Sequence, residues 1–258
     1  MSHNVPAGSK PTVADLDRPL YTPIKRRSFF MYAGATAGAT ALVLAGCSKD
    51  DNNSPGMVSV GSGDVGVLNY AYALEQLEAD FYTQVRSGSY YTSLSTSDPI
   101  RLILDDLYYH EVIHRDFFKT AITNANATPI QALKTVYPAN TFNSKSTVLA
   151  TAMAFEDLGV AAYNGAGQYI SSAQYLLIAG KIVSVEARHA AIIRDLVAEG
   201  SFVGNDIITL TSANKATGDT NYAPSGSSLE RSKTPSEVVA IANTFLQDGS
   251  KLDVSGIR

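Results

Sequence analysis

The side chains best suited to chemistry in this 258-residue chain are carboxylates and imidazoles that interrupt apolar stripes. In four segments the apolar residues recur every three or four positions, as on the buried face of a helix, and one glutamate stands in the middle of each stripe. Two of the stripes also carry a histidine, three residues after the glutamate. The six residues are Glu75, Glu111, His114, Glu156, Glu186 and His189.

Four buried glutamates require a shared positive charge. A buried carboxylate without a partner costs several kcal/mol of stability, and no lysine or arginine lies on these stripes. A pair of metal ions supplies the charge, and imidazole with carboxylate ligands suits iron or manganese. In Glu111-x-x-His114 and Glu186-x-x-His189 the spacing places both side chains on one helix face, about one turn apart. The sequence therefore predicts a site for two iron ions, or for manganese.

The elements that must position these residues are four helices. The same apolar spacing predicts them at 65–86, 99–123, 146–170 and 173–199. Asp98 followed by Pro99 is a typical start for the second helix. Ser171 and Gln174 match a capping box at the start of the fourth, and Gly200 ends it.

The chain also contains an internal repeat. The segment ALEQL with Tyr82 matches AFEDL with Tyr163, and in each half a glutamate precedes the tyrosine by seven residues. A Glu-x-x-His follows on the next predicted helix, 36 residues after Glu75 and 30 residues after Glu156. Two helical hairpins related by a pseudo-two-fold axis would bring all six side chains to one centre.

One glutamate from each of two helices, with Glu-x-x-His from each of two others, is the ferritin-like arrangement of metal ligands. Over about residues 65–200 the sequence resembles the ferritin-like family that includes bacterioferritin, manganese catalase and the desiccation-related proteins. The segments LEQLEADFY, YHEVIH, FEDLGVAAY and VEARHA are most similar to the desiccation-related branch. The resemblance implies an all-α, ferritin-like four-helix bundle. The 22 residues from Asn124 to Lys145 fit its single long crossover, between helices two and three.

The resemblance also implies a role for each of the six residues. Two carboxylates bridge the ions, two are terminal ligands, and each ion has one histidine. The bridging carboxylates would be Glu111 and Glu186, and the terminal ones Glu75 and Glu156. The histidines would be His114 and His189.

Three further residues lie close to this set in the sequence. The resemblance implies that Tyr82 and Tyr163 hydrogen-bond the terminal carboxylates, which makes them candidate catalytic residues. Ordinary core aromatics are an equally good interpretation. Glu78 lies one turn from Glu75 and is either a further ligand or a solvated or ion-paired carboxylate, and we favour the latter.

A rival motif overlaps the second helix. Residues 110–114 read HEVIH, the zinc-protease signature, in which His110 and His114 bind zinc and Glu111 is the general base. A zinc protease needs a third ligand, and no Glu or His occurs between His114 and Glu156. We therefore favour the di-metal site and expect His110 to be a neighbour of it. A bundle without metal remains a second alternative.

The N-terminal residues 1–46 have the features of an export signal. Arg26 and Arg27 precede a moderately apolar run, as in a twin-arginine signal, and the run ends at a lipobox-like LAGC whose cysteine is Cys47. Lipidation of Cys47 would anchor the protein to a membrane. Residues 47–64 are polar and predict a flexible tether. The alternative, a short transmembrane anchor, is disfavoured because the run is shorter than the ~20 residues that a span needs.

The composition narrows the partners. The net charge is −4 and no basic stripe is present, so nucleic acid is not an expected partner. Cys47 is the only cysteine, which excludes an intramolecular disulfide. In the extension formed by residues 201–258, Thr234, Pro235 and Glu237 predict a helix at about 235–247 that docks on the bundle.

Two reduced metal ions a few ångströms apart can deliver two electrons to O₂ or H₂O₂. The sequence thus favours a redox protein that oxidises iron or removes peroxide. A non-catalytic stress or desiccation-related envelope protein, with structural or absent metal, is the alternative. An oligomer is compatible with either function.

Overall fold

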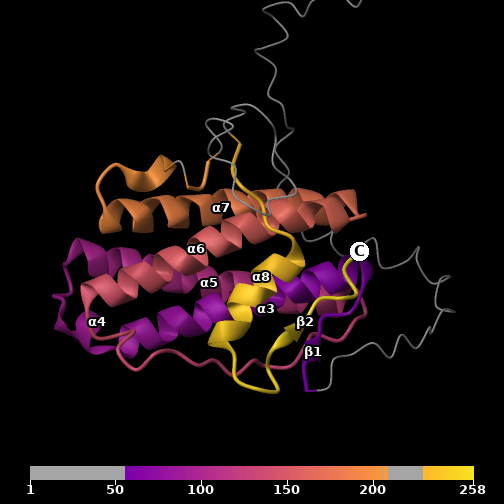
Figure 1. The fold of residues 1–258 in the computed structure, drawn as a ribbon, viewed down its shortest axis with the longest axis horizontal. Helices are drawn as coiled ribbons and strands as arrows, with labels where there is room; N and C mark the ends of the chain where they lie inside the picture. The colour runs from indigo at the N-terminus through magenta and orange to yellow at the C-terminus, as the bar shows by residue number, and fades with distance from the viewer. Residues whose placement is uncertain (1–55, 205, 209–228) are drawn as a thin grey trace, which may run out of the picture. The chain divides into compact units, whose positions relative to one another are not determined.

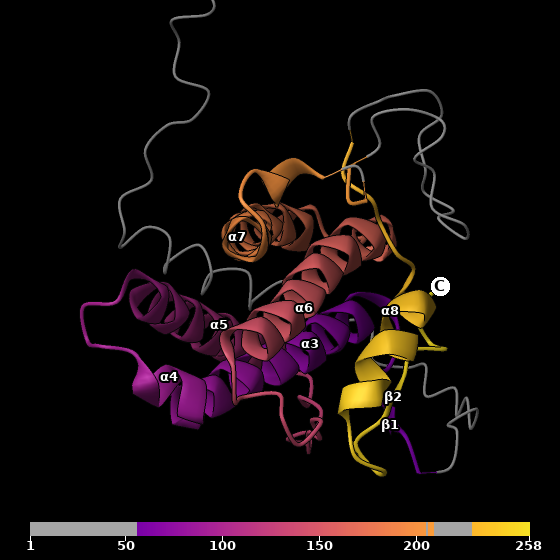
Figure 2. The same cartoon turned by 60° about the vertical axis from the view of Figure 1, so that its left-hand side comes forward.

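The predicted helical segments form four long helices in the computed structural model, which describes residues 56–204, 206–208 and 229–258. Figures 1 and 2 show these helices running lengthwise beside one another. They are α3 (Gly63–Ser87), α5 (Pro99–Asn124), α6 (Lys145–Ala166) and α7 (Ala173–Val197). α3 packs chiefly against α5, and α6 against α7, while α3 also meets α6. The two predicted hairpins and the all-α, four-helix architecture are therefore confirmed.

Local capping explains where three of the helices begin. The Asp98 carboxylate accepts a hydrogen bond from the backbone N–H of Ile100 at 2.9 Å, as predicted. Ser144 caps α6 by accepting from the backbone N–H of Thr147.

α7 begins at Ala173, as predicted, but its cap is Ser172 and not Ser171. Both serines give their backbone N–H groups to the Asp64 carboxylate, at 2.7 and 2.9 Å. Asp64 belongs to the first turn of α3, so a residue from the other hairpin holds the extended backbone of Ser172 immediately before the helix.

Both helices of the second hairpin end earlier than predicted. α6 ends at Ala166 and continues as the single 3₁₀ turn η2 (Gly167–Tyr169). α7 ends at Val197, three residues before Gly200, whose φ of 78° turns the chain into the 3₁₀ turn η3 (Ser201–Val203).

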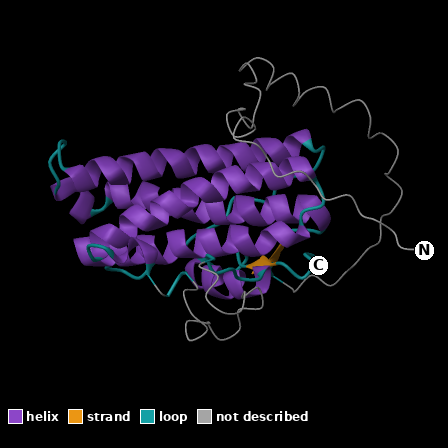
Figure 3. Ribbon diagram, turned by 90° about the horizontal axis from the view of Figure 1, so that it is seen from above, coloured by secondary structure: helices purple, strands orange, loops and turns teal. Residues whose placement is uncertain are grey.

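Three short elements have no signal in the apolar spacing. α4 (Ser89–Ser93) follows α3 directly, and β1 (Val58–Ser59) pairs in parallel with β2 (Leu252–Asp253). Figure 3 shows this small sheet, drawn in orange, beside the helices. Val60, just after β1, is 1% exposed. The prediction of a flexible tether as far as residue 64 is therefore wrong at its C-terminal end, because the chain from Val58 onward is part of the folded domain.

The predicted crossover between α5 and α6 is present and contacts the C-terminal segment. The backbone N–H of Val136 donates to the carbonyl of Phe245 at 2.8 Å, and that of Gln247 donates to Lys134 at 2.9 Å. The Gln76 side chain of α3 also accepts from the backbone N–H of Leu133 at 3.0 Å. These contacts hold the crossover against the bundle.

The C-terminal extension docks on the bundle, as expected. It contains α8 (Pro235–Ala242), followed by the 3₁₀ turn η5 (Asn243–Phe245), so its helix is shorter than the predicted 235–247. The predicted capping box between Thr234 and Glu237 is present. α8 lies against α6, and a Cβ at Gly165 would stand 1.8 Å from the backbone carbonyl oxygen of Lys233. Only glycine at position 165 lets the extension approach α6 this closely.

The apolar core is divided by the polar side chains. On α5, Leu104 and Leu107 belong to one cluster of buried apolar residues, and Phe118 and Ile122 belong to another. Glu111 stands between the two clusters and is fully buried. The bundle thus has an apolar block on each side of its carboxylates.

The predicted export signal and Cys47 lie outside the described residues. Within the described part of the chain, none of the helices is long and apolar enough to cross a membrane.

Candidate metal centre

The four helices bring all six predicted ligands together in the interior. The four glutamates are 0% exposed, His189 is 4% exposed and the side chain of His114 is 13% exposed. Their potential ligand atoms form two groups, each with all atoms within 4.8 Å of one another. One group is Glu75, Glu111, His114 and Glu186, and the other is Glu111, Glu156, Glu186 and His189.

Two glutamates belong to both groups, and the remaining four residues belong to one group each. The shared residues are Glu111 and Glu186. A carboxylate with two oxygens can address two ions at once, so this is the geometry expected of the two bridging carboxylates. Each group then keeps one further glutamate and one histidine.

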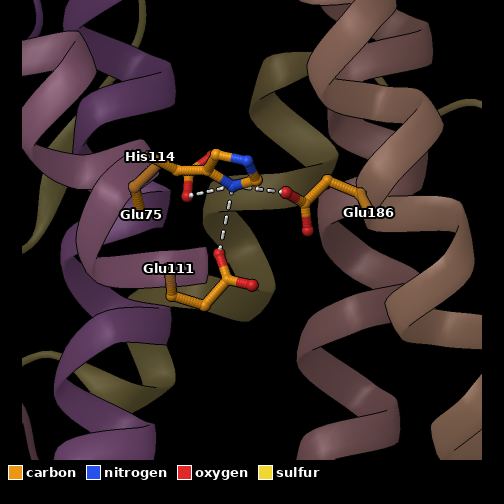
Figure 4. Close-up of side chains that lie close together, drawn as sticks. All are labelled: Glu75, Glu111, His114 and Glu186. Atoms are coloured by element: carbon orange, nitrogen blue, oxygen red, sulfur yellow. Dashed lines mark ion pairs between the residues drawn. The ribbon is translucent and has the colours of Figure 1, made fainter. Parts of the chain in front are cut away.

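His114 shows how the side chains of one group are arranged. Figure 4 shows carboxylates from three helices pointing toward the same ring nitrogen of this residue. Its Nδ1 lies 2.8 Å from an oxygen of Glu186, 3.4 Å from Glu111 and 3.5 Å from Glu75.

The other group repeats this geometry. Nδ1 of His189 lies 2.8 Å from an oxygen of Glu111, 3.4 Å from Glu186 and 3.5 Å from Glu156. The two halves of the site are therefore related by the pseudo-two-fold axis that the sequence repeat predicts.

The carboxylate oxygens and imidazole nitrogens that face the centre of the site are better suited to binding metal ions than to hydrogen-bonding one another. Within the described part of the chain, none of them has a hydrogen-bond partner of acceptable geometry. They are Oε2 of Glu75 and Glu156, both carboxylate oxygens of Glu111 and Glu186, and Nδ1 of His114 and His189. One imidazole nitrogen can serve only one of the three oxygens that face it. Buried, unsatisfied lone pairs that converge on two centres suit two cations, and this mixture of oxygen and imidazole ligands suits iron or manganese.

Without metal, protons must balance the charge. Burial raises the pKa of Glu75 well above its usual range and that of Glu156 to about 7. Burial opposes ionisation of Glu111 as well, but the two histidines whose Nδ1 atoms face it, at 3.4 and 2.8 Å, lower its pKa to about 2. Burial likewise opposes the charged form of His114, yet the surrounding glutamates raise its pKa to about 12. The metal-free site therefore binds protons at pH values where free carboxyl and imidazole groups would have lost them. Metal ions that bind to the site would displace these protons.

Two tyrosines tie the halves of the site together. The Tyr82 hydroxyl on α3 donates to Oε1 of Glu156 on α6, and the Tyr163 hydroxyl on α6 donates to Oε1 of Glu75 on α3. The expected hydrogen bonds are therefore present. Each leaves the second oxygen of the glutamate, Oε2, facing the histidine of its group. A catalytic part for either tyrosine stays a prediction.

Glu78 is not the solvated or ion-paired carboxylate that we favoured, and this interpretation is wrong. The residue is 4% exposed, and within the described part of the chain no basic side chain forms an ion pair with it. Burial raises its pKa well above the usual range, with further contributions from the four ligand glutamates. Its space is provided by Gly159, where a Cβ would stand 2.9 Å from Oε1 of Glu78. Glu78 belongs to neither ligand group, and a role as a further ligand stays open.

His110 does not join a zinc site. It belongs to neither ligand group, and its Nδ1 lies 2.8 Å from Nε2 of His189, on the outer side of that ring. Glu111 belongs to both ligand groups and is not placed as the general base of a zinc site. The HEVIH motif therefore does not form a protease centre in this fold. His110 is the expected neighbour of the site, but its contact with His189 has no signal in the sequence.

The geometry defines a class of protein, a four-helix bundle with a paired carboxylate and histidine centre. The ferritin-like domain family matches residues 63–199, which span all four helices and all six residues. Because the match covers just over half of the chain, the chain belongs to the ferritin-like family. No curated protein matches it.

Proposed function

We propose that this chain is an exported, lipid-anchored protein of the ferritin-like family whose two iron or manganese ions react with O₂ or H₂O₂. The convergence of unsatisfied, buried carboxylate and imidazole atoms on two adjacent centres carries this proposal. An apolar interior does not retain such a group of charges without a counterion or a function.

The chain's own residues would have distinct tasks. Bound metal ions supply the electrons for reduction of the oxidant. Glu111 and Glu186, which belong to both ligand groups, would each help to hold both ions. Tyr82 and Tyr163 fix the terminal carboxylates and offer hydroxyl protons at the edge of the site. The apolar clusters on both sides keep bulk water away.

The N-terminal sequence supports the location. The arginine pair at 26–27 and the lipobox at Cys47 favour export followed by attachment to a membrane through lipid. A protein held in the cell envelope meets O₂ and peroxide directly, so these small molecules are the proposed substrates. The resemblance of four segments to desiccation-related proteins favours a role in stress protection, with peroxide removal or iron oxidation as its chemistry.

The test is the metal content of the mature chain, residues 47–258 without lipid, purified from its own host. We expect about two iron or manganese ions per chain. A Glu111→Gln, Glu186→Gln double variant should lose both ions, because each carboxylate is shared by the two groups. Glu199→Gln, at an exposed position just after α7, is the matched control and should keep them.

The loaded protein is then mixed with O₂ and with H₂O₂ while absorbance and oxidant consumption are followed. Turnover of either oxidant supports the redox function. Stable binding of two ions without any reaction would leave the non-catalytic envelope protein. Absence of metal, or a single zinc ion that survives the double substitution, would refute the di-metal site itself.

A further inference from the structure

The sequence repeat pairs the two halves of the metal centre residue by residue. Glu111 corresponds to Glu186 and His114 to His189, so the residues just before these glutamates, His110 and Val185, also correspond. The ligand sets of the two halves are therefore alike, but the residue outside each set is not. An imidazole stands on one side and an apolar side chain on the other.

The imidazole contacts one ligand histidine directly. Nδ1 of His110 lies 2.8 Å from Nε2 of His189, and the two rings are stacked with centroids 5.1 Å apart and planes 23° apart. Nδ1 of His189 is the atom that faces the glutamates. A histidine that gives Nδ1 to a metal ion carries its proton on Nε2, so with metal bound His189 would be the donor and Nδ1 of His110 the acceptor.

The other half lacks this contact. Val185 has no atom that can accept a hydrogen bond, and among the described residues none is hydrogen-bonded to Nε2 of His114. The His114 side chain is 13% exposed, whereas that of His189 is 5% exposed. The outer nitrogen of one ligand ring thus contacts a protein side chain, whereas the described residues offer no such partner to the outer nitrogen of the other ring.

We propose that His110 is a positioning residue that makes the two metal positions unequal. Through the Nε2–H bond it fixes the tautomer and orientation of His189 and increases the basicity of its Nδ1. The position served by His189 therefore binds metal first and more tightly than the position served by His114. The inference rests on the proposed di-metal function and adds an order to the filling of the site.

Glu78 also breaks the symmetry, since Gly159 stands at the corresponding place. Its charge acts on all four ligand glutamates, two of which are shared by both positions. The His110 side chain is hydrogen-bonded to His189 and, among the described residues, to no other ligand. A change at His110 should therefore alter one binding step, and this separates its effect from that of Glu78.

The experiment is an anaerobic titration of the metal-free chain with Co²⁺ alone, followed by calorimetry and by the visible absorption of the bound ion. The wild type should bind about two ions in two resolved steps. His110→Ala should weaken the tighter step by about 10-fold or more and leave the weaker step unchanged. His110→Asn supplies a carbonyl oxygen as acceptor and should restore most of the loss. Val185→Ala is the matched control and should change neither step.

A double-mutant cycle assigns the steps. In a His114→Ala background only the His189 position remains, and His110→Ala should still weaken it. In a His189→Ala background the remaining step should be insensitive to position 110. Circular dichroism of each variant shows that the bundle is intact.

Three results would overturn the inference: no effect of His110→Ala, equal weakening of both steps, or failure of Asn to restore binding in a folded protein. A wild-type chain that binds no Co²⁺, Fe²⁺ or Mn²⁺ would instead overturn the proposed function. The two failures are therefore distinguishable.

Discussion

Tyr82 on α3 donates its hydroxyl hydrogen bond to Glu156 on α6, 74 residues away in the sequence. Both side chains are 0% exposed, and among the residues that the structure describes no second donor reaches Oε1 of Glu156. The reciprocal bond from Tyr163 to Glu75 makes the pair symmetric. These bonds link the two hairpins through the metal centre, so the stability of the bundle and the geometry of the site depend on the same atoms.

Tyr82→Phe should therefore weaken both. Removing the hydroxyl leaves a buried carboxylate oxygen without a donor, which costs about 1–3 kcal/mol of unfolding free energy. Glu156 also loses its fixed orientation, and metal affinity should fall about 10-fold. Urea denaturation of the metal-free chain and a Mn²⁺ titration measure the two effects. Tyr109→Phe, at a position that is 53% exposed, is the control and should change neither. Unaltered stability and affinity in Tyr82→Phe would show that the hydrogen bond is not formed.

The metal-free protein should lose stability as the pH rises from about 5 to about 8. The pKa of His114 is raised to about 12 and that of Glu156 to about 7, so the folded state binds more protons than the unfolded chain in this window. A group whose pKa is raised by folding contributes its full stability below the pKa of the unfolded chain. That contribution is lost progressively as the pH rises from this value toward the pKa of the folded state. The pKa of Glu111, lowered to about 2, gives the opposite slope below about pH 4.

We expect a decrease of about 2 kcal/mol in unfolding free energy between pH 6 and pH 8, measured by urea denaturation in the presence of a chelator. Saturating Mn²⁺ should remove this decrease, because the ions displace the protons, and a weakly buffered solution should acidify when Mn²⁺ is added. If the stability of the metal-free protein instead increased with pH, the folded site would not bind more protons than the unfolded chain, and the prediction would be wrong.

The helices and the six candidate ligand residues that meet in the interior were predictable from sequence, because each depends on spacing within one segment. The apolar period of α5 and the position of Glu111 within it are local properties. Contacts between distant segments were not predictable. The cap of α7 is Ser172, whose backbone N–H is bound by Asp64 in α3, and β1 and β2 are too short to show any period. His110 and His189 are 79 residues apart, and no spacing rule joins them.

Glu78 shows the same limit. Its spacing in the sequence places Glu78 one helical turn from Glu75. Whether its side chain is exposed to solvent or buried in the core depends on Gly159 of another helix. Had position 159 carried a larger residue, the carboxylate would have had to move. Only the packing of α3 on α6 reveals that the side chain is buried among other carboxylates.

Glu78→Gln should accordingly stabilise the metal-free protein at high pH. Burial and the four ligand glutamates raise the pKa of Glu78, so ionisation of the buried group costs stability as the pH rises. Glutamine keeps the shape without the charge. The gain in unfolding free energy should be near zero at pH 5 and about 1 kcal/mol or more at pH 8. Glu199→Gln, which is exposed, should show no such trend. A loss of stability at pH 8 would mean that Glu78 is ionised and has a favourable partner.

Arg194 should be the main polar link between α6 and α7. Its guanidinium donates two hydrogen bonds to Asp157, at 2.8 and 2.7 Å, and a further pair to Asp206, at 3.2 and 2.7 Å. Arg194 is 5% exposed. Asp206 is largely exposed, so most of the energy comes from Asp157, whose side chain is 21% exposed. Arg194→Ala leaves that carboxylate without its cation and should cost about 2 kcal/mol of unfolding free energy.

Arg194→Lys keeps the charge but loses the paired geometry and should recover only part of this. Arg188→Ala is the matched control on the same helix, because Arg188 is exposed and, in the described part of the chain, its guanidinium donates hydrogen bonds to Ser184 of its own helix and to no other residue. Denaturant unfolding of the three variants gives the comparison. Because Arg194 lies two turns beyond Glu186 on α7, its loss should also let the second hairpin fray at that end, and hydrogen exchange of α7 amides measures this directly. Equal stability of Arg194→Ala and Arg188→Ala would show that apolar packing alone holds the two helices together.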